Sequence, residues 1–348
     1  MDALLWQDKA LSLLDQSKYP HEEVWYDCNK LDAVLEALRI PGAVCGEAIL
    51  ASAGAYAYCL AALEHEGSHE FYKQLSLAKT ALLATRPSSA SLAAALSRME
   101  KAYEEYKLSD QLITALLATA VTIHRQDVVA CRNMSREGRE ILPDEAKIVL
   151  CCRGGVFHTG APGGPIGLLR SARMKQKDLE VFVCEHRPSG DGFAVARELA
   201  AAKIPVHVIP DHSAAALMPR RSCDMVLIEG LRAAKNGDLL AWPGAYELAI
   251  AAYFHSIPVY ATLYTEDYDT RILTGEAFPQ EDLSPAELSG FAKGSLPEGV
   301  SVWSPRHDVV LNQLLTGLIT DKGLIFPPFE ETIPEALTKA MNKPFLTL

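Results

Sequence analysis

The segment KIVLCCRGGVFHTGAPGGPIGLLR, residues 147–170, decides the fold because it joins a buried strand to a helix through a glycine-rich turn. The aliphatic residues at 148–150 favour a strand inside a sheet. The turn contains Gly154, Gly155, Gly160, Gly163 and Gly164. Glycine allows close approach of the backbone to a ligand, and the helix expected from about Gly164 directs its unpaired N–H groups at the strand end. The segment therefore predicts a site for a small molecule, with an environment that suits an anion or a thiolate.

Two adjacent cysteines, Cys151 and Cys152, end the predicted strand. Successive side chains of a strand point to opposite faces, so we expect Cys151 to pack in the core and Cys152 to face the site. Arg153 and the helix N-terminus favour the thiolate of Cys152, which is the reactive form of a cysteine. A buried cysteine without a chemical role is the alternative interpretation. His158, in the turn, is a candidate proton carrier near neutral pH, or an exposed loop histidine.

Composition limits the class of protein. The chain has 348 residues, of which 49% are hydrophobic and 22% charged, so it is long enough for about two globular domains. The formal charge of −11 argues against an extended nucleic-acid or membrane surface. No leader or long apolar run is evident, and we expect a cytoplasmic protein. The eight cysteines lack metal-ligand spacing, so neither a metal nor an organic cofactor is expected.

The pattern of apolar residues divides the chain near residue 140. Residues 1–140 predict a short β-hairpin followed by alanine-rich helices. Residues 141–348 alternate short apolar runs with helices, which predicts a Rossmann-like, mostly parallel sheet. The expected strands after the first are VFVC at 181–184, VHVI at 206–209, MVLI at 225–228 and VYAT at 259–262. Ligands of such sheets lie beyond the carboxyl ends of the strands, where polar residues collect in this sequence.

With these strand ends identified, the sequence resembles the methylthioribose-1-phosphate isomerase family, which is related to the alpha, beta and delta subunits of eukaryotic initiation factor 2B. The resemblance runs nearly from end to end. It rests on LLDQSKYP at 13–20, TRPSSASL at 85–92, the segment at 123–144, CEHRPSGDG at 184–192, AAKNGD at 233–238 and the closing segment at 304–328. It implies the two-domain fold, a small-molecule substrate, a homodimer and isomerisation between an aldose phosphate and a ketose phosphate.

The resemblance also implies site residues. Cys152 matches the catalytic cysteine, in LCCRGG where the family has THCNAG, and Arg86 matches a phosphate-binding arginine. Asp238, in the retained NGD, is a candidate catalytic group or a helix cap. The candidate substrate-binding residues are Arg86, Arg153, Gly154, Gly155, Asp191 and Trp242.

Several positions depart from the family motifs. Leu231, in EGLRAAKNGD, replaces the acid of GADRIAANGD, and an aliphatic side chain cannot transfer a proton. Pro41 replaces the arginine of a phosphate loop, and Ala241-Trp242 replaces an Asn-Lys pair. Loss of two cationic partners weakens phosphate binding by roughly 10²–10⁴. Asp191 stands where the family has glutamine.

Three functions remain open from the sequence. The first is a diverged enzyme that uses Cys152 on a sugar-like or other small polar metabolite, with an altered substrate or reaction. The second is a non-catalytic ligand-binding or regulatory subunit, as in initiation factor 2B. The third is a true sugar phosphate isomerase in which another group replaces the acid missing at Leu231.

Overall fold

A computed structural model describes residues 3–19, 22–40, 42–44, 46–87, 89–153, 162–284, 288 and 298–341, with the backbone only for Ala90 and residues 339–341. The contacts divide the chain into two compact units. The first contains the described residues up to Cys131, together with Pro162 and Gly163, and the second contains Arg132–Arg153 and the described residues from Gly164 onward. The boundary falls inside one long helix.

The first unit begins with a small antiparallel sheet. Its strands are β1 (Leu4–Gln7), β2 (Ala10–Leu14) and β3 (Trp25–Cys28), in the order β1-β2-β3. Asp8 and Lys9, both with positive φ, form a turn inside the first apolar stretch, which therefore contains two strands, β1 and β2, and not the single strand expected. The third strand lies in EEVWYDC, the second stretch expected in the hairpin, and pairs Leu11 with Cys28.

Five helices complete this unit: α1 (Leu31–Arg39), α2 (Glu47–Glu64), α3 (Phe71–Thr85), α4 (Ala90–Tyr106) and the first part of α5 (Leu112–Arg139). Helix α2 is rich in alanine and almost entirely buried. A Cβ atom on Gly54 would lie 2.2 Å from Leu92 Cδ1, so the missing side chain allows α4 to pack closely against α2. The Ser89 side chain caps α4 by accepting a hydrogen bond from Leu92 N.

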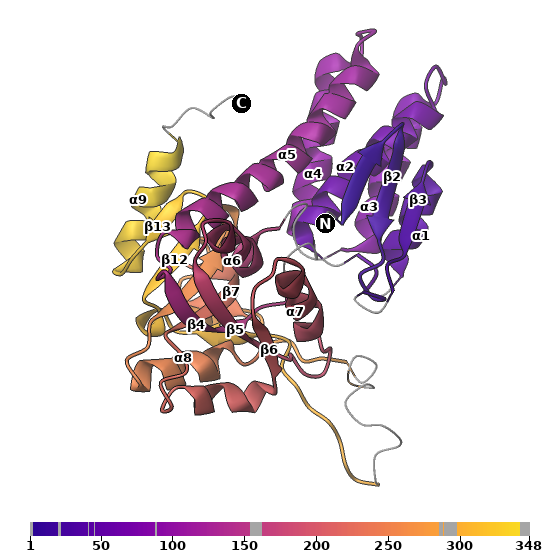
Figure 1. Cartoon of the computed structure of the whole chain (residues 1–348). Helices are drawn as coiled ribbons and strands as arrows, with labels where there is room; N and C mark the ends of the chain where they lie inside the picture. Colours follow the sequence, from indigo (N-terminus) through magenta and orange to yellow (C-terminus); the bar gives the residue numbers. More distant parts are fainter. Residues whose placement is uncertain are drawn as a thin grey trace. The chain divides into compact units, whose positions relative to one another are not determined.

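The second unit is built on a mostly parallel sheet (Figure 1). Its main strands are β4 (Glu145–Cys151), β5 (Asp178–Cys184), β6 (Val206–Ile209), β7 (Met225–Ala234), β9 (Val259–Leu263), β12 (Gly317–Thr320) and β13 (Gly323–Ile325). Three short strands, β8 (Leu239–Ala241), β10 (Tyr268–Asp269) and β11 (Asp308–Val310), extend the far half of β7. The Rossmann-like expectation is confirmed.

The strand order β13-β12-β9-β7-β4-β5-β6 contains one reversal of direction. From β4 the chain proceeds through β5 to β6, and then returns to the other side of β4 to form β7, β9 and β12. Ligands in doubly wound sheets bind at such a switch point, beyond the carboxyl ends of the two strands that flank it. Here these strands are β4 and β7, which pair in parallel with Cys151 opposite Ile228.

Helices cover both faces of this sheet. Residues of α6 (Gly164–Met174), α7 (Gly192–Ala201) and the end of α5 pack on one face. Residues of α8 (Ala245–Phe254), α9 (Phe329–Met341) and the 3₁₀ segment Asp211–Leu217 pack on the other. A Cβ atom on Gly192 would lie 2.1 Å from the Cys184 carbonyl oxygen, so only glycine lets α7 begin so close to the end of β5.

Among the described helices, α5 alone is long and apolar enough to cross a bilayer by length and composition, a test that core helices also pass.

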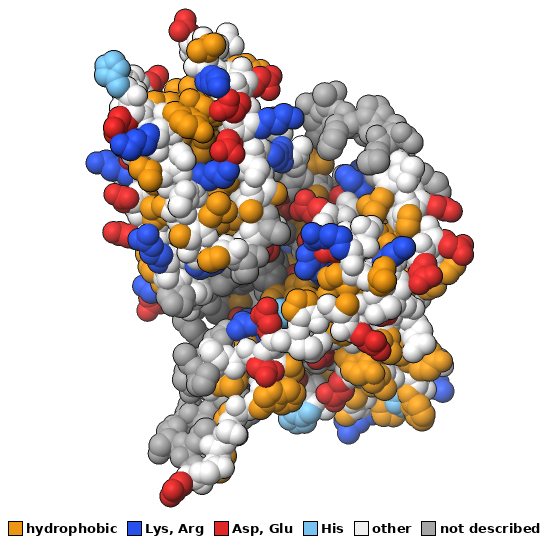
Figure 2. Space-filling model, turned by 180° about the vertical axis from the view of Figure 1, so that it is seen from behind, with side chains coloured by type: hydrophobic (Ala, Val, Ile, Leu, Met, Phe, Trp, Pro, Cys, Tyr) orange, Lys and Arg blue, Asp and Glu red, His pale blue; other side chains and the backbone are white. Residues whose placement is uncertain are grey.

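On the face drawn in Figure 2, basic and acidic side chains are intermingled over the surface.

Candidate functional site

The two adjacent cysteines lie on opposite faces of the sheet, as alternation predicts. Cys151 packs in the cluster with Val149 and Ile228, and Cys152 packs in the cluster with Leu150 and Ile166. Both side chains are buried, and Cys152 has no exposed surface. Burial raises the pKa of the Cys151 thiol well above its ordinary value, which suits a core residue. Cys152 thus directly follows β4 at the switch point, and its side chain is buried.

Three of the predicted substrate-binding residues lie together beyond the ends of β4 and β5. Arg153 Nε donates a hydrogen bond to Asp191 Oδ2, and the Arg153 guanidinium carbon lies 4.5 Å from the centre of the Trp242 ring. Asp191 Oδ2 also accepts from Ser189 Oγ at 2.6 Å. The guanidinium is therefore matched by a carboxylate and stacked on an indole, an arrangement typical of arginine.

Glu229, at the end of the regular part of β7, joins this group although the sequence did not single it out as a site residue. Its Oε2 atom accepts hydrogen bonds from Trp242 Nε1 at 2.7 Å and from Arg153 N at 3.1 Å. The side chain is buried, with 7% of its surface exposed. The signal in the sequence was an acidic residue directly after the apolar run MVLI. We call Arg153, Asp191, Glu229 and Trp242 the switch-point cluster.

His186 lies beside the switch-point cluster in a strained backbone conformation, with φ of +58°. Its backbone N–H donates to Asp211 Oδ1 at 2.9 Å, which fixes the turn after β5. The ring is buried, and its Nε2 atom has no hydrogen-bond partner within the described ranges. Burial lowers the pKa of His186, and Asp211, Arg153, Asp191 and Glu229 are its charged neighbours. His186 is thus a buried imidazole whose Nε2 atom lacks a hydrogen-bond partner within the described ranges.

The acid sensitivity of folding should depend on His186. Its pKa in the folded protein lies below the ordinary 6.5, so below about pH 6.5 the unfolded chain binds a proton that the folded chain does not. The contribution of His186 to the free energy of unfolding is complete above this pH. It decreases as the pH falls through this value, by up to about 1.4 kcal/mol per pH unit. We expect wild type to lose about 2–6 °C more in Tm between pH 7.5 and 5.5 than His186→Asn.

Asparagine suits this test because it tolerates positive φ. The matched control is His212→Asn, at an exposed histidine of the same unit, which should keep the wild-type pH dependence. An equal loss of Tm in wild type and His186→Asn would refute the prediction.

A second histidine, His307, lies near Trp242 on the segment before β11. The ring centres are 5.7 Å apart, and burial lowers the pKa of His307. Like His186, it was not predicted as a site residue, because only the fold brings residues around 307 to the switch-point cluster.

Asp238 lies apart from this cluster in a network of its own. It is buried and accepts four hydrogen bonds, from Asn236 Nδ2, Gly275 N, Asn312 N and Asn312 Nδ2, at 2.8–3.0 Å. These contacts join the loop after β7 to two segments far along the chain. They favour a structural role over the proposed catalytic one.

Arg86, at the C-terminal end of α3, belongs to the first unit. Its guanidinium donates to Thr85 O at 2.9 Å and to Val44 O at 3.4 Å. Its role as an anion-binding residue stays a prediction. His158, Gly154, Gly155 and Pro41 lie outside the described residues.

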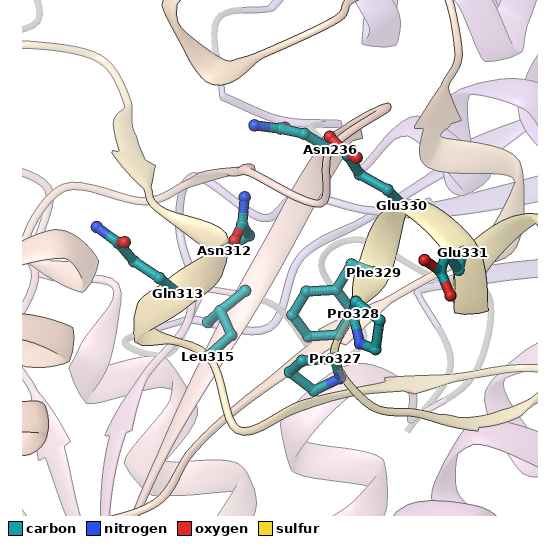
Figure 3. A pocket seen from close by; sticks show the side chains of 9 residues that line it. All are labelled: Asn236, Asn312, Gln313, Leu315, Pro327, Pro328, Phe329, Glu330 and Glu331. Carbon is teal, nitrogen blue, oxygen red and sulfur yellow. The ribbon is translucent and has the colours of Figure 1, made fainter.

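A cavity of about 310 Å³ opens on the second unit beside the Asp238 network (Figure 3). Its lining is formed by Asn236, Asn312, Gln313, Leu315, Pro327, Pro328, Phe329, Glu330 and Glu331. It contains none of the predicted site residues. Within the described part of the chain, no three His, Cys, Asp or Glu side chains are grouped to hold a metal ion.

Comparisons with known proteins agree with the resemblance inferred from the motifs. A model of the initiation factor 2 subunit family matches residues 43–327. Methylthioribose-1-phosphate isomerase from Desulforudis audaxviator is 38% identical over 97% of this chain and 98% of its own, and the enzyme from Pelotomaculum thermopropionicum is 34% identical over 96% and 93%.

Two solved structures are similar over nearly the whole chain. The 5-methylthioribose 1-phosphate isomerase from Pyrococcus horikoshii has a TM-score of 0.91 at 27% identity, with 97% of this chain and 96% of that chain covered. The delta subunit of translation initiation factor eIF-2B from A. fulgidus has a TM-score of 0.89 at 28% identity, with coverage of 97% and 99%.

Proposed function

Because the chain belongs to the initiation factor 2 subunit family and has a function like that of methylthioribose-1-phosphate isomerase, we propose that it isomerises a sugar-like metabolite other than methylthioribose 1-phosphate. The reaction moves hydrogen between neighbouring carbons and uses Cys152. The observation that carries the proposal is the position of Cys152 and the switch-point cluster at the reversal of strand order, where ligands of such sheets bind. We further propose that the enzyme is a cytoplasmic homodimer without a metal or organic cofactor.

The charges of the switch-point cluster support an altered substrate. Arg153 is paired with Asp191, and Glu229 adds a second carboxylate, so the cluster has two acidic groups and one guanidinium. The excess of negative charge in this cluster repels a phosphate dianion. Trp242 instead offers an aromatic face, which suits an apolar or neutral part of a substrate. Leu231, in the irregular part of β7, supplies no charge.

A non-catalytic, ligand-binding subunit is the second candidate. The complete burial of Cys152 favours it, because a reactive thiol must reach its substrate. The similarity to an eIF-2B subunit is consistent with the same function. The first candidate converts a substrate and the second does not, so a measurement of turnover decides between them.

The test is a substrate panel followed by proton NMR. Purified protein is incubated with methylthioribose 1-phosphate, other aldose 1-phosphates and unphosphorylated aldoses, and ketose formation is recorded. We expect turnover of at least one aldose, with methylthioribose 1-phosphate converted at least about 100-fold less efficiently. Ordinary rates with methylthioribose 1-phosphate would overturn the altered substrate, and absence of turnover with every compound would overturn the enzymatic function.

A further inference from the structure

We propose that Glu229 is the proton-transferring carboxylate of this chain, in the place of the acid missing at Leu231, and that Trp242 is its positioning residue. The assignment rests on the proposed function and specifies which group performs its chemistry. It starts from the position of Glu229 in the sheet. Cys151 is opposite Ile228 in the parallel pairing of β4 with β7, so Cys152 and Glu229 are the next residues at the switch point.

The surroundings of Glu229 hold a carboxylate in one orientation. Two donors among the described residues, Trp242 Nε1 and the Arg153 backbone N–H, bind Oε2. A Cβ atom on Gly164 would lie 3.5 Å from Oε1, which places this second oxygen beside the first residue of α6. The N-terminus of a helix stabilises negative charge, and hydrogen bonds to a carboxylate are strong. The group is therefore held in one orientation, in surroundings that favour its carboxylate form.

A break in the regular pairing of β7 explains how a carboxylate at position 229 can replace the acid missing at position 231. The pairing of β7 with β8 shifts register between Gly230 and Arg232, so Leu231 occupies the bulge. Glu229 precedes the bulge and is paired regularly with Thr262 of β9. Trp242, at a second position that departs from the family motifs, supplies the shorter hydrogen bond to Glu229. One of the departures from the family motifs thus supplies a hydrogen-bond donor to the carboxylate of Glu229.

A second observation indicates that a ligand belongs here. The Nε2 atom of His186 is buried and lacks a partner within the described ranges, and Glu229, Arg153 and Asp191 are among its charged neighbours. Buried polar atoms normally have a hydrogen-bond partner. A substrate hydroxyl or carbonyl at the switch-point cluster would satisfy this nitrogen.

The proposed step uses an open-chain aldose. Glu229 takes the proton from C2, the C2–H electron pair becomes the C1=C2 bond, and the carbonyl π pair moves to O1, which gains a proton. Glu229 then returns its proton to C1 while O2 loses its proton and becomes the carbonyl oxygen. Cys152, next to Glu229, exchanges the oxygen-bound protons. One proton has moved from C2 to C1 and one from O2 to O1, with no oxidant.

The experiment compares Glu229→Gln with wild type on the aldose that the panel identifies. Glutamine keeps the size of the side chain and an oxygen acceptor for Trp242 but cannot take up the proton. We expect kcat to fall by about 10²–10⁴, with a parallel fall of deuterium incorporation at carbon from D₂O. The matched control is Glu185→Gln, at a partly exposed acid after β5, which should keep wild-type kcat.

Trp242→Phe tests the positioning role, since phenylalanine retains a ring beneath Arg153 but not the N–H donor. We expect a roughly tenfold lower kcat, and an acidic limb of the pH–rate profile at higher pH because a carboxylate without this donor takes up a proton more readily. A purely structural role would leave the profile in place.

The outcomes separate the two proposals. A wild type without turnover on the whole panel overturns the proposed function and the assignment of Glu229 with it. An active wild type with an equally active, folded Glu229→Gln overturns the assignment alone. If Glu229→Gln does not fold, the pH profile of Trp242→Phe decides, and an unshifted profile overturns the assignment.

Discussion

Replacement of Cys152 by alanine is expected to lower kcat for the identified aldose by a factor of about 10²–10⁴, the usual cost of losing a proton-transfer group. The same replacement at Cys151 should leave kcat within about twofold of wild type. Steady-state kinetics on the two variants and wild type measures the effect.

The two cysteines form a matched pair. Both are buried, Cys151 as the last residue of β4 and Cys152 as the residue after it, and each variant removes one sulfur from an apolar cluster, so the cost in stability is similar, about 1 kcal/mol. A difference in activity therefore reports chemistry and not packing. Equal kcat values for Cys152→Ala and Cys151→Ala would show that Cys152 is a core residue and would exclude it from the proposed reaction.

Replacement of Asp238 by alanine is expected to lower the free energy of unfolding of the second unit by about 3–5 kcal/mol. The carboxylate is buried and accepts four hydrogen bonds, so its removal leaves the N–H groups of Gly275 and Asn312 without their acceptor. Thermal unfolding should show a decrease in Tm of about 6–15 °C.

Asp110→Ala, at an exposed carboxylate between α4 and α5, is the control and should unfold at the wild-type temperature. A stable Asp238→Ala that has lost activity would reverse the interpretation, because it would assign Asp238 to catalysis and not to the loop network. The measurement therefore also tests the catalytic role first expected from the NGD motif.

The sequence predicted the local features well because they depend on near neighbours. The period of two in LCC placed Cys151 and Cys152 on opposite faces, and the glycines before residue 164 indicated the start of α6. The alternation of apolar runs and helices predicted the parallel sheet. The segment after β6, Asp211–Leu217, is a 3₁₀ helix and not an α-helix. Its Asp211 instead anchors the turn at His186.

The contacts of the site were not predictable in the same way because they join residues far apart in the chain. Arg153 and Asp191 are 38 residues apart, Arg153 and Glu229 are 76 apart, and the acceptor role of Asp238 depends on Asn312, 74 residues on. The sequence indicated Arg153 as a candidate substrate-binding residue. The structure shows its charge already matched by Asp191.

By itself, then, the sequence determined the family, the sheet and the two faces of β4, since strand periodicity and glycine turns are local properties of a chain. Only the tertiary structure decided that Ile228, which precedes Glu229, pairs with Cys151, which precedes Cys152, and that His186 has a buried nitrogen without a partner in the described part of the chain. The strand order and the strand register set these positions, and neither can be inferred from the neighbouring residues in the sequence.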